Sequence, residues 1–326
     1  MSLQITRHGI LDTIQDLGRY GHQHLGINPN GAMDRFSAQL VNALLGKDLN
    51  AAVMELHFPA AEILFEKENI ICIGGADFSP TINDELIPLH HPVAVNKGAV
   101  LKFIKPKMGA RCYLSFLNDL KIDQWMNSYS TNLKACVGGC NGRQLLKNDS
   151  FAFENKFPVS KFLQQKTFSI LPWKAQYTVD TRNEIEFIIG SEWHWLTKDA
   201  QQTFQEHWFQ ITNEADRMGY RLAGQKLQTK NDEQLISSAV SFGTVQLLPN
   251  GQIIILMADH QTTGGYPRIA HVISAHLPIL AQKKPNDVIK FKLTTLEAAE
   301  KKINEQKKHL RQLQMACKFR LEELMS

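Results

Sequence analysis

The sequence has few cysteines and no long hydrophobic run, and both absences limit the class of protein. Five cysteines in 326 residues are an odd number in a long chain, which argues against the disulfide framework of a small secreted domain. No apolar stretch approaches the roughly 20 residues that a transmembrane helix needs. The first residues, Met1 to Arg7, lack the apolar segment of a signal peptide. We therefore expect a soluble, cytoplasmic protein with reduced thiols.

Signatures of metal, nucleotide and nucleic-acid binding are also missing. The sequence contains no G-x-x-x-x-G-K-[S/T] phosphate-binding loop. Cys136 and Cys140 have no second cysteine pair and lie among apolar residues and glycines, so buried thiols are a simpler interpretation than a zinc site. We accordingly expect no metal. The net charge of +4 is small, and the sequence shows no basic face with interleaved aromatics, so nucleic-acid binding is not expected.

The pattern of short apolar runs indicates a β protein with more than one domain. The chain is long enough for two domains, with 43% hydrophobic and 21% charged residues. Between residues 60 and 175, apolar runs recur about every ten residues, as is typical of antiparallel barrels and sandwiches. A domain boundary is predicted near residues 172–181. Helices are predicted after Asp34 and after Thr197, and an apolar stripe predicts a long helix over 296–325.

A polar loop at residues 257–270 is the clearest candidate for a binding site. It follows a β-branched run at 252–256 that predicts a buried strand. Gly264 and Gly265 allow positive φ and a close approach of the backbone to a ligand. The loop also carries a concentrated set of hydrogen-bonding side chains: Asp259, Gln261, Thr262, Thr263, Tyr266 and Arg268. A binding loop on a rigid scaffold is predicted; the alternative is a hairpin loop whose polar groups cap its own backbone.

Two further polar clusters resemble this loop in composition. The first, at residues 13–19, contains Thr13, Gln15, Asp16 and Arg19. The second, at residues 213–222, contains Asn213, Arg217, Tyr220 and Arg221. Arginine presents a fork of donors that suits a carboxylate or a phosphate, so the second cluster could bind an anion. The alternatives are a local Asp16–Arg19 pair and an ordinary surface turn.

Single acidic residues and one glycine-rich stretch leave alternatives open. Asp34 is either a helix N-cap or an acid of the site, and Asp77 caps a turn or reaches a ligand. Glu55 lies in an apolar run and needs a partner, either an arginine or a backbone turn. The stretch 127–143 combines hydroxyl groups with glycines and could cradle a phosphate.

The order of six motifs resembles the C subunit of prokaryotic 5-oxoprolinase. This family is also called KipA, allophanate hydrolase subunit 2-like or biotin-dependent carboxyltransferase family protein. The resemblance covers about residues 4–295. The motifs are Thr13-Ile-Gln-Asp-Leu-Gly-Arg19, Gly31-Ala-Met-Asp34, Gly75-Ala-Asp77, Ser128-Tyr-Ser-Thr-Asn-Leu133, Arg217-Met-Gly-Tyr-Arg221 and Asp259-His-Gln-Thr-Thr-Gly-Gly-Tyr-Pro-Arg268. The chain departs from the family at Leu117-Asn-Asp119 and at Gly190-Ser-Glu192, which leaves its fine substrate specificity open.

The resemblance implies a mainly β fold with two cyclophilin-like β-barrel domains and a few helices. We expect the first barrel domain over residues 1–175, the second over 176–295 and a C-terminal helix over 296–326. It also implies a KipI-like B subunit and a LamB/YcsF-like A subunit as partners. The implied activity is the opening of 5-oxo-L-proline to L-glutamate by the complex, driven by ATP.

Two other functions are compatible with the same resemblance. One is a carboxyltransferase component that acts on urea or a similar amide with a biotinyl partner. The other is a regulator without enzymatic activity that binds a KipI-like inhibitor of a histidine kinase. Covalent biotin is not expected, because Lys107-Met108 lies in Pro-Lys-Met-Gly and no Met-Lys-Met site is present.

The resemblance implies roles for the polar residues already singled out. The catalytic carboxylates are expected to be Asp259, Asp16 and Asp77. ATP, with magnesium, is expected at the level of the complex. Its phosphoryl oxygens need donors, for which the arginines are the candidates. The expected substrate- or ATP-binding residues are Gln15, Arg19, Asp34, Asn213, Arg217, Tyr220, Arg221, Gln261, Thr262, Thr263, Gly264, Gly265, Tyr266 and Arg268.

Overall fold

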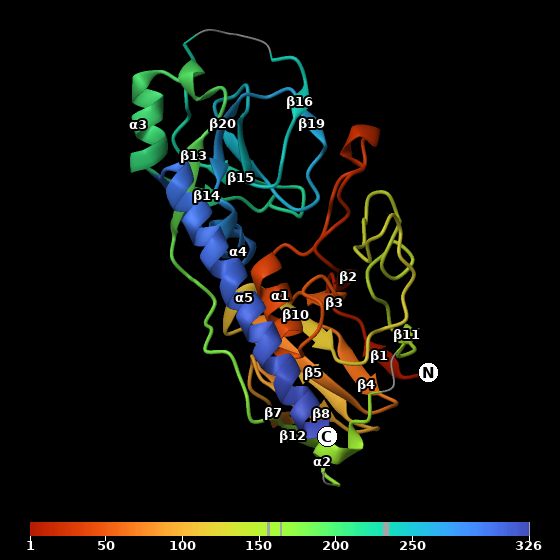
Figure 1. Ribbon diagram of the computed structural model, residues 1–326. Coiled ribbons are helices and arrows are strands. Elements are labelled where there is room, and N and C mark those ends of the chain that lie inside the picture. Colours follow the sequence, from red (N-terminus) through yellow and green to blue (C-terminus); the bar gives the residue numbers. More distant parts are fainter. Residues whose placement is uncertain (155–156, 164, 231–234, 326) are drawn as a thin grey trace. The chain divides into compact units, whose positions relative to one another are not determined.

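The computed structural model describes residues 1–154, 157–163, 165–230 and 235–325, which divide into two compact units (Figure 1). Unit 1 contains Met1–Gly18, Asp34–Val179 and the chain from Lys307 onward. Unit 2 contains Arg19–Met33 and Asp180–Gln306. Residues 19–33 thus belong to unit 2 although they precede most of unit 1 in the sequence, and the sequence patterns did not separate them.

Two six-stranded antiparallel sheets form the body of unit 1. The first has, in order, β11 (Ser150–Phe151), β1 (Leu3–Arg7), β4 (Glu62–Phe65), β9 (Val100–Phe103), β6 (Pro80–Ile82) and β7 (Glu85–Leu86). The second has, in order, β12 (Phe168–Ile170), β8 (Pro92–Val95), β5 (Asn69–Asp77), β10 (Met108–Phe116), β3 (Val53–Leu56) and β2 (Thr13–Gln15). Phe65 of the first sheet and Leu114 of the second lie in one buried cluster, so the sheets share a core.

Helix α1 (Arg35–Leu44) packs against β5 and β10 of unit 1. Asp34 is its N-cap: the carboxylate accepts the backbone N–H of Ser37 at 2.8 Å and the Ser37 hydroxyl at 2.6 Å. Gly46 follows the helix with φ of +63°, and a Cβ there would lie 2.8 Å from Cα of Lys318. The predicted helix after Asp34 is confirmed. The unit also contains the short helix α2 (Ser160–Leu163).

A closed seven-stranded barrel forms the body of unit 2. Its strands are, in order, β13 (Glu184–Ile189), β20 (Arg268–Val272), β17 (Thr244–Leu247), β18 (Ile253–Leu256), β15 (Gly219–Ala223), β14 (Trp208–Ile211) and β21 (Val288–Leu293). The pair β13–β21 is parallel and closes the barrel. Phe204 stacks on Phe291 with ring centroids 4.3 Å apart, so α3 (Lys198–Glu206) contributes an aromatic side chain to the barrel core.

Shorter elements complete unit 2. Helix α3 begins after its N-cap Thr197 as predicted, but it ends at Glu206 because Trp208 already starts β14. A two-stranded sheet pairs β16 (Ser238–Ala239) with β19 (Thr263–Gly264). The remaining elements are α4 (Leu277–Ala281) and the 3₁₀ turns η1 (Gln23–Leu25), η2 (Trp193–Trp195) and η3 (Ser274–His276).

Helix α5 (Leu296–Met325) is the long blue ribbon of Figure 1 and confirms the predicted C-terminal helix. Its predicted apolar stripe is buried at Leu310, Cys317 and Leu321. Residue 326, the last of the predicted range, lies outside the described residues. The predicted mainly β fold with a few helices is confirmed. Within the described ranges, no helix has both the length and the apolar character to cross a bilayer.

Candidate functional site

Backbone hydrogen bonds to residues 238–240 anchor the polar loop between β18 and β20. Thr263 and Gly264 form β19, and the backbone N–H of Val240 donates to the carbonyl of Thr262 at 3.1 Å. Thr263 and Gly265 are exposed, while Thr262 is half-buried. A Cβ on Gly264 would lie 2.6 Å from Nε2 of Gln246, so a larger residue there would displace that amide group. Backbone pairing therefore ties the loop to residues 238–240, and its role in binding stays a prediction.

A buried ion pair lies behind this loop in unit 2. The Arg217 guanidinium donates from Nε to Oδ2 of Asp259 and from Nη2 to Oδ1, both at 2.9 Å. Nδ2 of Asn30 also donates to Oδ1 of Asp259 at 2.8 Å, and Nη2 of Arg217 donates to the carbonyl of Gly31 at 2.7 Å. Asn30 in turn accepts Nη1 of Arg19 at 2.5 Å. We call Arg19, Asn30, Arg217 and Asp259 the buried brace.

The buried brace holds three distant segments of unit 2 together. Asp259 is 8% exposed and Arg217 is 6% exposed, and each carboxylate oxygen of Asp259 accepts a hydrogen bond from Arg217. Charge-assisted pairs of this bidentate kind fix geometry as well as adding energy. The arrangement positions residues 28–31 and the loop after β18. A catalytic role for Asp259 stays a prediction.

A cavity of about 550 Å³ opens next to the same loop. Three predicted binding residues line it, namely Arg221, Gln261 and Tyr266. Its wall also includes polar residues that the sequence patterns did not single out, namely Glu214, Asp216, Gln246 and Asn250. The volume falls within the range typical of small-molecule sites, and more than half of the lining residues are polar or charged. We call this the barrel pocket.

The polar side chains of the barrel pocket differ in how firmly they are held. Gln246 is 1% exposed and donates from Nε2 to the carbonyl of Tyr266 at 3.4 Å. Asp216 accepts the backbone N–H groups of Met218 at 2.7 Å and Gly219 at 3.0 Å. Arg221 and Glu214 form an exposed pair at 3.1 Å, which screening by water makes weak. The guanidinium of Arg221 is thus held by a weak, exposed ion pair.

Arg268 is engaged by a partner that sequence reasoning did not connect with it. Its guanidinium binds Glu192 through Nε at 2.9 Å and Nη2 at 2.8 Å, and its backbone N–H binds the same carboxylate at 2.8 Å. Burial raises the pKa of Glu192, but the hydrogen bonds from Arg268 outweigh this effect and lower it. A Cβ on Gly190 would lie 2.1 Å from the carbonyl oxygen of Arg268, so the turn before Glu192 requires glycine.

The other predicted residues of the second polar cluster do not line the barrel pocket. Tyr220 is 2% exposed and belongs to the barrel core. Asn213 is exposed and does not line the barrel pocket. Successive side chains on a strand point to opposite faces, which explains why Tyr220 is internal while its neighbour Arg221 reaches the pocket.

In unit 1, Asp16 organises the hydroxyl-rich segment at residues 128–130. Its Oδ1 accepts the hydroxyls of Ser128 at 2.8 Å and Ser130 at 2.5 Å, and the backbone N–H of Gly18 at 2.7 Å. Its Oδ2 accepts the backbone N–H of Tyr129 at 2.7 Å. Asp16 is 2% exposed. Two motifs that lie far apart in the sequence are therefore one hydrogen-bonded cluster.

The side chain of Gln15, which precedes Asp16, also forms a local hydrogen bond. Gln15 is fully buried, and its Nε2 donates to the Thr13 hydroxyl at 3.0 Å. Asp77, the third predicted catalytic carboxylate, accepts the backbone N–H of Ser79 at 2.7 Å and pairs with Lys107 at 3.4 Å. The structure thus shows Asp77 capping a turn, which was one of its two predicted roles.

A buried tyrosine is one partner of Glu55. The Tyr113 hydroxyl donates to Oε2 of Glu55 at 2.8 Å and accepts the backbone N–H of Asp34 at 2.7 Å. Burial raises the pKa of Tyr113 well above its usual value, and the charges of Glu55 and Asp34 act in the same direction. The sequence analysis expected an arginine or a backbone turn and did not single out this tyrosine.

The expectation of buried thiols is wrong for Cys136 and Cys140. Cys136 is exposed and Cys140 is half-buried, because both lie on a glycine-rich loop beside a second cavity. All five cysteines are free thiols. In the part of the chain that the structure describes, no group of three or more His, Cys, Asp or Glu side chains is arranged to hold a metal ion.

Asp12 makes a pH-dependent contribution to the stability of unit 1. Burial raises its pKa from 3.8 to about 7, although the backbone N–H groups of His57 and Ala61 lower it. The folded state therefore binds the proton more tightly than the unfolded state. The resulting stabilisation is full below about pH 4 and is lost as the pH rises through about 7, a change of about 4 kcal/mol.

We expect Asp12→Asn to remove this pH dependence, because the amide does not titrate. The free energy of unfolding should be measured by urea titration for both proteins between pH 4 and pH 8. The wild-type value should fall relative to the variant value as the pH rises. Parallel curves over the whole range would contradict the assignment to Asp12.

Comparisons with known proteins place this mainly β chain in a family. It belongs to the carboxyltransferase domain family, whose description for subdomains A and B matches residues 25–293. The chain is 35% identical over 289 residues to the C subunit of the 5-oxoprolinase of Haemophilus influenzae, and the match covers 89% of this chain and 90% of that protein. The resemblance predicted from the motifs is confirmed.

Two fungal proteins share the same architecture in part of their length. The urea amidolyase of Saccharomyces cerevisiae is 28% identical over 314 residues, which cover 89% of this chain and 16% of that protein. The crystal structure of the K. lactis urea amidolyase superposes with a TM-score of 0.87 at 24% identity, over 96% of this chain and 20% of that chain. This last likeness shows the fold. The chain thus spans about a fifth of the K. lactis protein.

Proposed function

We propose that this chain is the subunit of an ATP-dependent 5-oxoprolinase complex that contributes a substrate pocket. The complex hydrolyses 5-oxo-L-proline to L-glutamate together with a KipI-like B subunit and a LamB/YcsF-like A subunit. The observation that carries the proposal is the barrel pocket, where one arginine and two glutamine side chains converge. The name of the bacterial relative, which matches over nearly its whole length, supplies the substrate.

The chemistry of the barrel pocket suits a small carboxylated lactam. The guanidinium of Arg221 would bind the carboxylate of 5-oxoproline, in place of its weak exposed pair with Glu214. The lactam offers one N–H donor and one carbonyl acceptor. Gln246 and Gln261 each offer both a donor and an acceptor, so they can match both groups of the lactam. The Tyr266 hydroxyl could bind the lactam oxygen.

The lining of the barrel pocket does not fit a nucleoside triphosphate. Its charged side chains are Glu214, Asp216 and Arg221, so carboxylates outnumber the single guanidinium. A triphosphate carries several negative charges and needs an excess of positive donors. We therefore propose that ATP and magnesium bind at the level of the complex, and that this pocket holds only the lactam.

Arg221→Ala in the reconstituted complex tests the carboxylate assignment. A charge-assisted hydrogen bond contributes about 1.5–3 kcal/mol, so KM for 5-oxoproline should rise about 10- to 100-fold. The value of kcat should change less, because the carboxylate does not react. Arg221→Lys should recover part of the loss. Arg182→Ala is the matched control, since Arg182 is also an exposed arginine in an ion pair and lies away from the pocket. An unchanged KM in Arg221→Ala would contradict the proposal.

The activity of the complex needs its own experiment. Turnover of 5-oxoproline and ATP should be measured with all three subunits and with this chain omitted. Glutamate should form only in the complete mixture. Glutamate formation at the full rate without this chain would rule out the role proposed for it.

A carboxyltransferase component acting on urea or a similar amide is the second candidate. The observation that favours it is the 28% identity to S. cerevisiae urea amidolyase over most of this chain. It predicts that a biotin carboxylase and a biotin carrier co-purify with the chain, and that carboxylated carrier is consumed when urea is added. A regulator without enzymatic activity would instead alter histidine kinase autophosphorylation, with no cleavage of 5-oxoproline by the complex.

A further inference from the structure

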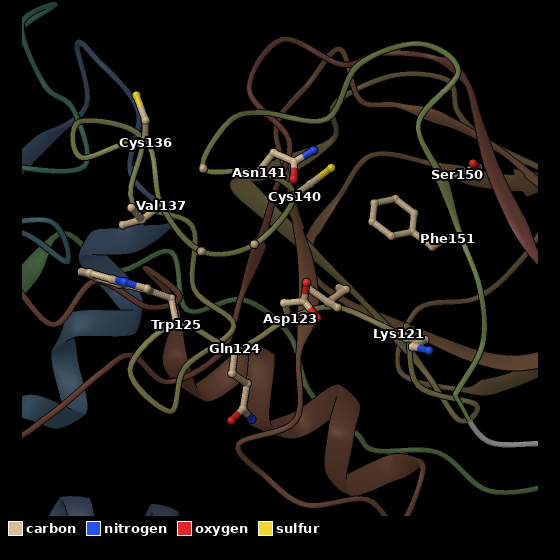
Figure 2. Close-up of a pocket in the computed structure, with 14 residues that line it drawn as sticks. Lys121, Asp123, Gln124, Trp125, Cys136, Val137, Cys140, Asn141, Ser150 and Phe151 are labelled. Carbon is tan, nitrogen blue, oxygen red and sulfur yellow. The ribbon is translucent and has the colours of Figure 1, made fainter.

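A second cavity, of about 500 Å³, lies in unit 1 and is independent of the barrel pocket. Its wall comes from residues 121–125, residues 136–142 and the strand β11. Trp125 and Val137 appear at one side of the view in Figure 2, and Phe151 at the other. None of the residues predicted to bind substrate or ATP lines it. We call it the glycine-loop pocket.

The backbone of the glycine loop has an unusual run of left-handed residues. Gly138, Gly139, Asn141 and Gly142 have φ between +52° and +71°. A Cβ on Gly139 would lie 2.0 Å from the Thr131 hydroxyl, and one on Gly142 would lie 1.9 Å from the carbonyl carbon of Cys136. The loop is therefore packed tightly on itself, and its curvature is imposed by contacts with its neighbours.

This curvature leaves four consecutive amides at the pocket without a protein acceptor. Within the described residues, the backbone N–H groups from residue 138 to residue 141 donate to no other group of the chain. The first partnered amide after them is that of Gly142, which donates to the carbonyl of Gly138 at 2.7 Å. Successive amides in left-handed turn geometry form a concavity that attracts anions.

The side chains around these amides indicate which other groups a ligand of this pocket would carry. Lys121 supplies an exposed ammonium group, and Asp123 supplies one carboxylate. Arg143, which follows the loop, is already bound to Asp149 through two hydrogen bonds of 2.7 and 2.8 Å. Trp125 and Phe151 add aromatic surface. A ligand that binds these amides through an anionic group would therefore also carry an apolar, preferably planar, group that contacts the aromatic side chains.

The hydroxyls near the loop and the Cys140 thiol do not indicate a different kind of ligand. The hydroxyls of Ser128 and Ser130 are bound to Asp16, and that of Thr131 donates to the carbonyl of Ile14 at 2.9 Å. Burial raises the pKa of the Cys140 thiol to about 11, so this sulfur is protonated near neutral pH and is a poor metal ligand.

We propose that the glycine-loop pocket binds a small organic anion, a carboxylate or a phosphate ester carried on a planar apolar group. The charged oxygens accept hydrogen bonds from the free amides of residues 138–141 and attract Lys121. The apolar group packs against Trp125. The site is separate from the lactam pocket and does not depend on the proposed 5-oxoprolinase activity.

Titration with three matched probes tests the site. Benzoate carries a carboxylate, phenyl phosphate carries a phosphate ester, and benzamide has the shape of benzoate without its charge. The chain is labelled with ¹⁵N, and the amide resonances of residues 138–141 are followed up to about 20 mM probe, where ligands of millimolar affinity saturate. At least one anion should shift these resonances saturably, with benzamide binding about 10-fold more weakly. The better of the two anions identifies the charged group. Equal binding of benzamide, or no saturable shift with either anion, would overturn the proposal.

Charge variants connect the binding to the pocket. Asn141→Asp keeps the shape of the side chain and tolerates the left-handed backbone, with φ of +54°, but adds a negative charge at the amides. It should weaken benzoate and phenyl phosphate binding at least about 10-fold. Asp123→Asn should strengthen binding, since it removes a repulsive charge. Asn286→Asp is the matched control, because Asn286 is an exposed left-handed asparagine of unit 2. Equal affinity in Asn141→Asp and Asn286→Asp would place the anion elsewhere.

Discussion

Asp259→Ala is expected to lower the free energy of unfolding of unit 2 by about 3–5 kcal/mol. The change removes one partner of a buried ion pair and leaves the Arg217 guanidinium uncompensated in a region where it is 6% exposed. It also removes the acceptor of Asn30. For a unit of this size the unfolding temperature should fall by roughly 10 °C, as measured by calorimetry.

Two comparisons make this result specific to the buried brace. Glu214→Ala breaks an exposed ion pair of the same unit and should cost at most about 0.5 kcal/mol. The double variant Arg217→Met, Asp259→Leu removes both charges, and it should be less destabilised than the sum of Arg217→Met and Asp259→Leu measured separately. Simple additivity of the two single variants would show that the residues are not energetically coupled.

The same position separates a positioning role from a catalytic role. If Asp259 positions the loop, Asp259→Asn should retain part of the 5-oxoprolinase rate of the complex, since the amide oxygen can still accept a hydrogen bond. If Asp259 is the general base, Asp259→Asn and Asp259→Ala should lose similar rate. An unchanged rate in a folded, assembled Asp259→Ala complex would contradict both roles.

Asp16→Ala is expected to have the second largest effect, in unit 1. It removes a carboxylate that is 2% exposed and that accepts four hydrogen bonds. Hydrogen bonds to a charged group contribute about 1.5–3 kcal/mol each but are not additive, so a total cost of about 3–4 kcal/mol is expected. The segment at residues 128–130 should be held less tightly, while the bonds from Thr131 to Ile14 of β2 remain.

Hydrogen exchange distinguishes this local loss from general unfolding. The amides of residues 128–130 should exchange faster in Asp16→Ala than those of β5, because their anchor is removed while the sheet remains. Asp84→Ala, which breaks an exposed pair with Lys102, is the matched control and should leave both sets unchanged. Uniformly faster exchange throughout unit 1 would contradict a local role of Asp16.

Features that depend on neighbouring residues could be predicted from the sequence. Asp34 and Thr197 were recognised as N-caps because a cap is a bond between residues three positions apart. The apolar runs between residues 60 and 175 indicated short strands, of which β4 (Glu62–Phe65) is one, because the apolar content of a strand is local. The loop after β18 was recognised because its polar residues and two glycines are contiguous. These predictions needed no knowledge of which segments meet.

Partners that are distant in the sequence could not be predicted in this way. Asp259 binds Asn30, which lies 229 positions away, and Glu55 binds Tyr113, 58 positions away. The correct partner of Arg268 is Glu192, across 76 residues. In each case many arginines, asparagines or tyrosines are chemically equivalent as candidates, and only the pairing of the strands selects one.

By itself, the sequence determined the β character of the chain, the positions of its main helices, the polar loops and the family. The tertiary structure decided which of those polar residues face a cavity. Pairing of β15 and β17 with opposite edges of β18 brings Arg221 and Gln246 to either side of Ile254 at the pocket, while Tyr220 lies in the barrel core. The physical reason is that a cap is satisfied within one turn of chain, whereas a pocket exists only when distant strands pair and enclose it.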